Sequence, residues 1–364
     1  MDLYTQISNC AISIDRLSAP ILNETIEISS NWMMKLFKIT DTGDNSFFNN
    51  CHTNEDKTSF IQDNLVKLYN VNTGKLMTPG GVYDAGWFIS PTVGEIKRIS
   101  RRTKLGTPII KIVQGVDVGK AHILASYFES FQGAGQFNAL EMMKPSVTWL
   151  DGIFNYIYDN TQGPRTALSC APGTFVRNYC LPQFNALEKL NIQPQNGYLL
   201  WDSHPESILS KIENNSDNIM IPAMIYTQVA GITKSNCLGK HILDKRVHQI
   251  YASGVPVEAY NNKGNYDTQL EIAKTILLAE YIGTIGLSLI LHDIDVKAGL
   301  TKLDRPKINL TLVGAGVFNV PLLTVIDVIN EAIAHFGDKD CEIMIHGFSS
   351  FEADTLRQHI KILN

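Results

Sequence analysis

The segment 308–330 has the clearest capacity for chemistry, because an apolar strand runs into a glycine turn and then directly into a helix. The β-branched run 308–313 is typical of a buried strand. Gly314, Ala315 and Gly316 follow this run and allow a tight turn with little steric hindrance. This order of elements is suited to holding an anion.

The expected helix begins near Pro321, whose fixed φ fits a first helical turn. The backbone N–H groups of Val317, Phe318 and Asn319 should then point toward whatever fills the turn. Free N–H groups and a helix N-terminus favour negative charge, so a phosphate is the expected ligand. The alternative is a strand-to-helix turn that binds nothing.

Polar residues and glycines also crowd the segment 130–179, which we interpret as ligand-lining loops that are too polar for a core. Its polar members include Gln132, Gln136, Asn138, Glu141, Asp159, Gln162, Arg165, Arg177 and Asn178. Amides and carboxylates of this kind can recognise a small polar ligand. The alternative is a turn-rich connection whose polar groups bond only its own backbone.

Four separated motifs together resemble an atypical macrodomain family. They are QGAGQFNALEM, YIYDNTQGPRTALSCAPGTFVRNY, VHQIYASGVPVEAY and LTLVGAGVFNVP, and the last strand, CEIMIHGF, also resembles the end of a macrodomain. The family includes the bacterial effector MavL and eukaryotic proteins. The resemblance spans roughly residues 108–350, and its specificity comes from the order of the four motifs.

The resemblance implies an ADP-ribose site. By position, the loop that wraps the diphosphate and the distal ribose in macrodomains corresponds to Gly314, Gly316, Val317, Phe318 and Asn319. Asn138 matches an asparagine that faces the ribose, and Gln136 and Gln162 are expected to be further ligand-binding amides. The adenine is expected against apolar and aromatic surface near the other strand ends.

Asp159 and Glu141 are the predicted catalytic residues, because a carboxylate near the ribose can stabilise an oxocarbenium-like transition state or activate water. Asp159 could equally cap the turn that follows it, and Glu141 could lie exposed on a short helix. The chain lacks the glycine-triplet loop of typical hydrolytic macrodomains and the consecutive glutamates of poly(ADP-ribose) glycohydrolases. Binding is therefore better supported than a specific hydrolysis.

The sequence thus predicts a protein that binds ADP-ribose and hydrolyses it from a modified protein side chain. A non-catalytic reader of ADP-ribosylated proteins, a sensor of free ADP-ribose and a nucleotide-phosphate hydrolase are the alternatives. The resemblance implies ADP-ribose and an ADP-ribosylated protein as partners, with ubiquitin one candidate, and it implies no cofactor. We expect a cytoplasmic protein, delivered into a host cell if it is a bacterial effector.

Other chemistries are less well supported. Ser253 lacks the first glycine of a nucleophile elbow, Cys170 has no neighbouring histidine in sequence, and His248 is expected to be a satisfied sheet histidine. The histidines have no tight ligand spacing, so no metal site is predicted. The cysteines form no CxxC pair, which argues against a structural zinc site and a disulfide framework. They are Cys10, Cys51, Cys170, Cys180, Cys237 and Cys341.

The composition is that of a globular protein with a large core: 364 residues, 44% of them hydrophobic, and a net charge of −5. The basic clusters at 97–98 and 101–104 are too short for a nucleic-acid-binding stripe. The first twenty residues show no secretory signal, which favours a reducing compartment. We interpret the apolar stretch 275–291 as a helix followed by a buried strand, not a membrane span.

Strands alternating with helices from residue 108 onward must position these candidate residues. Expected strands cover 109–113, 219–226, 247–252, 286–291, 308–313 and 342–347, and expected helices cover 268–281, 322–336 and 351–363. This pattern predicts a macrodomain-like three-layer α/β/α mixed sheet, with ligands at the carboxyl ends of the strands. Residues 1–105 are assigned to a helical, loop-rich N-terminal lobe, and residues 106–364 to the ADP-ribose-binding domain with insertions.

Overall fold

The computed structural model describes residues 2–14, 32–39, 51–151, 153, 156–157, 159, 161–181, 183–201, 204–232 and 240–361. Cys237 and the end of the predicted last helix, 362–363, lie outside these residues. The helices are α1 (Leu3–Ile12), α2 (Trp32–Phe37), α3 (Asn54–Asn64), α4 (Val93–Ser100), α5 (Val118–Leu124), α6 (Gln162–Ser169), α7 (Ala171–Phe175), α8 (Glu206–Ile212), α9 (Tyr266–Lys297), α10 (Leu322–His335) and α11 (Ser350–His359). The strands are β1 (Tyr69–Asn70), β2 (Lys75–Thr78), β3 (Gly81–Asp84), β4 (Trp87–Ile89), β5 (Ile109–Gln114), β6 (Ser130–Gly135), β7 (Ala223–Ile232), β8 (Lys240–Ser253), β9 (Lys307–Thr311) and β10 (Glu342–Gly347).

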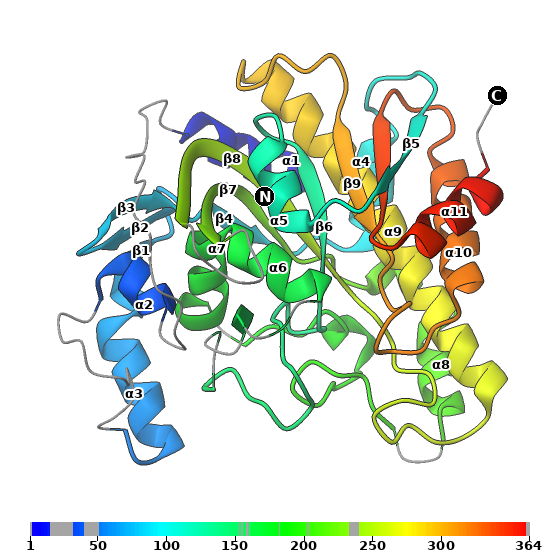
Figure 1. Cartoon of the computed structure of the whole chain (residues 1–364), viewed down its shortest axis with the longest axis horizontal. Helices are drawn as coiled ribbons and strands as arrows, with labels where there is room; N and C mark the ends of the chain where they lie inside the picture. Colours follow the sequence, from blue (N-terminus) through cyan, green and yellow to red (C-terminus); the bar gives the residue numbers. More distant parts are fainter. Residues whose placement is uncertain are drawn as a thin grey trace.

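A seven-stranded mixed sheet in the order β4-β7-β8-β6-β9-β10-β5 forms the centre of the molecule (Figure 1). The five strands from β8 to β5 are parallel to one another, and β7 is antiparallel to both of its neighbours. The predicted mixed sheet flanked by helices is therefore confirmed. Because the parallel strands share one direction, their carboxyl ends meet at one edge of the sheet.

Helices cover both faces of this sheet. Successive side chains of a strand point to opposite faces, and on β6 the Gln132 side chain contacts Thr284 of α9 while Gly133 packs against Thr166 of α6. The long helix α9 therefore covers one face, together with α1, α4, α8 and α10, which pack on it. The helices α5, α6 and α7 cover the other face. This arrangement is the three-layer architecture that the sequence pattern predicted.

The predicted strand at 286–291 is wrong, because α9 continues through it as one helix from Tyr266 to Lys297. The helix is buried on nearly all sides in this part, so its apolar residues show no helical periodicity. Gly283 and Gly286 lie so close to Ile221 and Ile96 that a Cβ would overlap those side chains. In the described part of the chain α9 alone is long and apolar enough to cross a membrane, but 83% of its apolar window is buried inside the protein.

The interpretation of 130–179 as loops too polar for a core is wrong for the parts that form β6, α6 and α7. Residues 130–135 form the central strand β6, and Gln132, Arg165 and Arg177 are buried. The Gln132 amide is matched to nearby partners, because it contacts both Thr284 and Thr311. Burying a polar side chain costs little folding free energy when the side chain has hydrogen-bond partners. It nevertheless interrupts the hydrophobic pattern by which a strand is recognised in sequence.

The predictions for β5, β9, β10 and α10 are confirmed within one or two residues. These elements are short runs rich in apolar residues, alternate in apolar character or carry one apolar stripe, which is what sequence patterns detect best. The strand predicted at 219–226 instead begins at Ala223 and extends to Ile232 as β7. The domain boundary at residue 105 stays a prediction, although β4 and α4, which precede it, belong to the main sheet and its helical layer.

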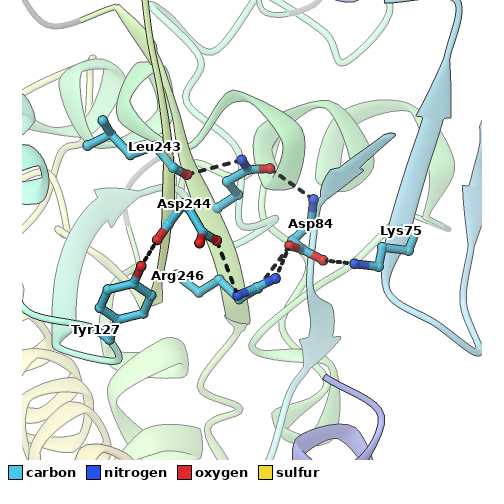
Figure 2. A network of polar contacts seen from close by, with 7 residues as sticks. Lys75, Asp84, Tyr127, Leu243, Asp244 and Arg246 are labelled. Atoms are coloured by element: carbon cyan, nitrogen blue, oxygen red, sulfur yellow. Dashed lines mark hydrogen bonds and ion pairs between the residues drawn. The ribbon is translucent and has the colours of Figure 1, made fainter. Parts of the chain in front are cut away.

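The N-terminal region adds a small antiparallel sheet, β1-β2-β3, that the sequence did not predict. A buried polar network joins it to the main sheet (Figure 2). Asp84 of β3 accepts from Arg246 of β8 at 2.6 and 2.8 Å and from Lys75 of β2 at 2.5 Å. Gln228 of β7 accepts from the Asp84 backbone N–H and donates to the Leu243 carbonyl. Because the Asp84 and Arg246 side chains are buried and paired, the position of this small sheet is well defined.

Candidate functional site

One cavity of about 390 Å³ lies at the carboxyl ends of the four adjacent parallel strands β6, β9, β10 and β5. Three interstrand spacings separate the first strand from the last, so the cavity extends over roughly 14 Å. It is lined by Val116–Val118, Ala134–Gln136, Glu141–Met143, Asp159, Thr161–Gly163, Arg165, Tyr198, Tyr260, Thr311–Phe318, His346, Phe348 and Glu352. The two dense regions of the sequence analysis, 130–179 and 308–319, therefore meet in one place.

The glycine turn forms the middle of the cavity wall. Gly314 has φ +84°, a conformation that favours glycine, and the turn is closed by bonds from Val320 N–H to the Gly314 carbonyl and from Asn319 N–H to the Gly316 carbonyl. Among the described residues, no protein acceptor engages the N–H groups of Gly316, Val317 and Phe318. Three donors are thus available for a ligand, as a phosphate site requires.

The structure corrects two details of the predicted turn. The N–H group of Asn319 is not available, because it is bonded to the Gly316 carbonyl at 3.0 Å, and Asn319 does not line the cavity. The helix α10 begins only at Leu322, so Val317 and Phe318 belong to the turn and not to the first turn of the helix. Any anion binding here depends on the turn's own N–H groups.

Glu141 lies at the β6 end of the cavity and is only 9% exposed. It does not lie exposed on a helix, which was the alternative from sequence. The Tyr156 hydroxyl accepts from its backbone N–H at 2.7 Å, and its carboxyl group packs against Gly163 so closely that a Cβ there would overlap it. The Oε1 atom has no hydrogen-bond partner among the described residues. The carboxyl group thus has one buried oxygen whose hydrogen-bonding capacity is unused by the described residues.

Burial raises the pKa of Glu141 well above its ordinary value, the Arg177 guanidinium opposes this shift, and the Asp159 carboxylate adds to it. Loss of hydration disfavours the charged form of a carboxyl group, and a neighbouring negative charge acts in the same direction. Glu141 is consequently protonated well above the pH at which an exposed glutamate ionises. A protonated carboxyl group beside a bound ligand can act as a general acid.

Asp159 lines the same end of the cavity. Its Oδ1 accepts from the Thr161 backbone N–H at 2.8 Å, which is the turn-capping contact considered as an alternative to catalysis. The two roles are compatible, because a carboxylate has a second oxygen and several acceptor positions. Asp159 and Glu141 thus form an acidic pair at one end of the cavity.

The three amides predicted to bind ligand are used in contacts within the protein. Gln136 accepts from and donates to the backbone of Met142, and Gln162 bonds the backbone of Gln132 and Ala134 in β6. The Asn138 side chain accepts from the Leu140 N–H, and Asn138 lies outside the cavity. Gln136 and Gln162 also line the cavity, so ligand binding by these two amides stays a prediction. They shape the loops that present Glu141 and line the cavity.

Three aromatic rings close the acidic end of the cavity. Tyr198, Tyr260 and Phe318 have ring centroids 5.1 to 5.9 Å apart. Tyr260 lies in a loop in which Glu258, Tyr260 and Asn261 all have positive φ, a conformation that side chains other than glycine rarely adopt. Such strain persists where surrounding contacts hold it, and it is frequent at functional sites.

The opposite end of the cavity combines an aromatic ring, a carboxylate and a neutral histidine. Phe348 follows β10 and is 73% exposed, and Asp117 precedes α5, where it accepts from the Gly119 N–H at 2.9 Å. Burial lowers the pKa of His346 to about 4, so its ring is uncharged at neutral pH. Its Nδ1 is buried without a partner in the described residues. This end is suited to a flat, polar-edged group such as a nucleobase.

Sequence reasoning missed Asp117, Tyr198, Tyr260, His346 and Phe348. A signal existed for Asp117 and Phe348, because both lie within a few residues after predicted strands and ligands bind beyond the carboxyl ends of strands. Tyr198 and Tyr260 reach the cavity on irregular loops far apart in the sequence. No local pattern identifies such residues.

The residues set aside in the sequence analysis do not line the cavity. Cys170 is fully buried, and His248 is buried with its Nε2 3.1 Å from Asp295. Ser253 is 3% exposed and donates its N–H to Glu280. Within the described ranges, no group of three or more histidine, cysteine, aspartate or glutamate side chains is arranged to hold a metal ion.

Neither a protein-family profile nor a curated protein sequence matches the chain. Similar solved structures include poly(ADP-ribose) glycohydrolase from Thermomonospora curvata, with a TM-score of 0.44 and 11% identity over 84% of this chain and 99% of that chain. The Deinococcus radiodurans poly(ADP-ribose) glycohydrolase in complex with ADP-ribose gives 0.43 and 12% over 75% and 92%. A Trypanosoma brucei macrodomain in complex with ADP gives 0.33 and 13% over 70% and 69%. All three TM-scores are below 0.5, so these likenesses assign no function.

Proposed function

We propose that the protein binds ADP-ribose in the cavity and hydrolyses the bond between its distal ribose and a modified protein side chain. One observation carries the proposal: the turn with three available N–H groups lies between the end of the cavity that holds Glu141 and Asp159 and the end that holds Phe348 and Asp117. A diphosphate flanked by a ribose and a nucleoside has the same order of groups. The resemblance of the four sequence motifs to a macrodomain family supports the same ligand.

In this pose the diphosphate accepts hydrogen bonds from Gly316, Val317 and Phe318. The adenine lies beside Phe348, and the Asp117 carboxylate can accept from its amino group. The distal ribose lies beside Glu141 and Asp159, with the Phe318 ring bordering it. The orientation follows from chemistry, because only the ribose end carries a bond that a general acid can help to break.

The reaction then uses two carboxyl groups. Glu141 donates its proton to the leaving atom of the acceptor side chain while the bond to the ribose C1 breaks, and the bonding electron pair stays with the acceptor. The Asp159 carboxylate stabilises the positive charge that develops on the ribose. It then takes a proton from the water that attacks C1 and releases this proton to solvent, and Glu141 regains a proton from solvent.

The binding part is tested with Gly316→Val. An added side chain at Gly316 would meet no protein atom within 4 Å, so the variant should fold, but the side chain would stand beside the proposed phosphate position. Calorimetry should show a loss of ADP-ribose affinity of about tenfold or more, because two or three phosphate hydrogen bonds are disturbed. Unchanged affinity in the folded variant would remove the phosphate assignment.

A non-catalytic reader is the second candidate, and the Asp159 contact with Thr161 favours it, because a carboxylate that caps a turn needs no catalytic role. The two candidates differ in one assay. Release of ADP-ribose from mono-ADP-ribosylated arginine and glutamate substrates should occur with the wild type if it is a hydrolase. ADP-ribose binding without release from either substrate would instead establish the reader.

A further inference from the structure

The end of β9, from which the glycine turn starts, is not held by its neighbouring strand β6. The two strands pair only at Ser130–Ile308 and Phe131–Asn309, and they separate before Thr311. If β6 and β9 stayed paired as in a regular sheet, the Thr311 N–H and carbonyl groups would bond the backbone of β6. Here the N–H donates to the Gln132 side chain of β6, and the carbonyl accepts from the Tyr281 side chain of α9 as well as from the Val313 N–H at 3.0 Å.

Tyr281 of α9 provides the first contact. Its hydroxyl donates to the Thr311 carbonyl at 2.6 Å and accepts from the Val313 N–H at 3.1 Å, and its ring is fully buried. The hydroxyl therefore bridges the two backbone groups just before Gly314. It does not line the cavity.

Thr284, one helical turn further along α9, provides the second contact through Gln132. The Gln132 amide donates to the Thr284 hydroxyl at 3.2 Å and accepts from the Thr311 N–H at 3.1 Å. Tyr281 thus contacts the Thr311 carbonyl directly, and Thr284 is linked to the Thr311 N–H through the Gln132 amide. Tyr281 and Thr284 both belong to the buried helix α9. The Tyr281, Thr284 and Gln132 side chains are all buried, and the Thr284 hydroxyl also donates to the Glu280 carbonyl at 2.8 Å.

We infer that Tyr281, assisted by Thr284, is a positioning residue that holds the base of the glycine turn in the geometry needed to bind a diphosphate. This inference rests on the proposed function. The backbone bonds of the turn are all local, running from Val313 to Thr311, Ala315 to Leu312, Asn319 to Gly316 and Val320 to Gly314, so its placement relative to the rest of the cavity depends on what holds its ends. Preorganised N–H donors bind an anion more tightly than donors that must be ordered first.

The test compares Tyr281→Phe with Tyr226→Phe, a matched control. Tyr226 is also buried and also donates its hydroxyl, to Asp295 at 2.7 Å, but it lies away from the cavity. Tyr281→Phe should weaken ADP-ribose binding about tenfold and speed amide hydrogen exchange in residues 312–320. Tyr226→Phe should lower the melting temperature but should change neither the binding nor the exchange in residues 312–320. Thr284→Val should give the same pattern as Tyr281→Phe with a smaller loss of affinity.

The inference fails if Tyr281→Phe and Thr284→Val bind ADP-ribose as tightly as Tyr226→Phe does. It also fails if exchange in residues 312–320 rises no more than in the rest of the core. If Tyr281→Phe does not fold, Thr284→Val decides the matter by the same two measurements. Absence of ADP-ribose binding by the wild type would refute the proposed function, but the exchange measurement would still show whether α9 holds the turn.

Discussion

Two buried glutamates lie near the same strand ends, and they differ in what they face. Glu141 lines the cavity beside Asp159, whereas Glu280, on α9, lies behind the loop that follows β8 and accepts from the Ser253 N–H at 2.8 Å. Both have one carboxyl oxygen without a partner among the described residues. Burial raises the pKa of both carboxyl groups well above the ordinary value.

The comparison teaches that a perturbed carboxyl group is not in itself a sign of function. Desolvation acts on Glu141 and Glu280 alike, because both are inside the protein. Only access to a ligand distinguishes them, and access is a property of the cavity. Glu141 is a candidate general acid since it combines a protonated state with a position at the acidic end.

The strongest test of this difference replaces each glutamate by glutamine. Glu141→Gln removes the transferable proton and should lower the rate of ADP-ribose release by about a hundredfold to ten-thousandfold. ADP-ribose affinity should change by no more than about threefold. Glu280→Gln keeps an acceptor for the Ser253 N–H and should keep the wild-type rate. Equal rates for the two variants would show that Glu141 has no special role.

Asp159→Asn separates catalysis from turn capping. The asparagine can still accept from the Thr161 N–H, so a purely structural Asp159 predicts full activity and a stability loss below about 1 kcal/mol. The proposed mechanism predicts a rate about a hundredfold lower, because the neutral amide cannot stabilise the developing charge on the ribose. Steady-state release from the substrate that the wild type accepts, together with thermal unfolding, measures both quantities.

A smaller effect should follow from moving Glu141 without changing it. An added Cβ in Gly163→Ala would overlap the Glu141 carboxyl group, which must then shift, and the rate should fall roughly tenfold. The control is Gly94→Ala, since Gly94 is likewise the second residue of its helix and lies far from the cavity in the fold. A normal rate in Gly163→Ala would indicate that the carboxyl position is not critical.

The smallest effect concerns stability and pH, where the two glutamates should behave alike. In the folded protein, a carboxyl group with a raised pKa stays protonated. In the unfolded chain, the same group ionises above a pH of about 4.3. The unfolded state is therefore increasingly favoured as pH rises, and the buried carboxyl group lowers the stability of the fold. Glutamine has no such penalty. Melting temperatures of Glu141→Gln and Glu280→Gln should therefore rise relative to the wild type between pH 5 and pH 8. A constant difference over this range would contradict the raised pKa values.

The fold could be predicted from the sequence where apolar residues stand in short runs or recur with a regular period. β10 and α10 were found because their apolar residues recur with the period of the element, and β5 and β9 were found as runs rich in apolar residues. β6 and the second half of α9 were not found, since polar partners replace apolar contacts in the first and burial surrounds the second. Local pattern does not record which residues will be buried on all sides.

The candidate site could be predicted in part for the same reason. The glycine turn and the two acids stand in compact motifs, and the structure places Gly316, Glu141 and Asp159 in one cavity. The function of the glutamine amides was not predictable, because their partners are backbone groups brought close only by the folded loops. Tyr198 and Tyr260 reach the cavity through tertiary packing alone.

The orientation of ADP-ribose is the central claim, and a crystal structure of Glu141→Gln with ADP-ribose tests it most directly, because that variant should bind the ligand without turning over a substrate. We predict the diphosphate on the N–H groups of residues 316–318, the adenine beside Phe348, and the C1 hydroxyl of the distal ribose within hydrogen-bond distance of residue 141. A ligand bound in the reverse direction, with its adenine beside residue 141, or a diphosphate that does not contact the turn, would contradict the account.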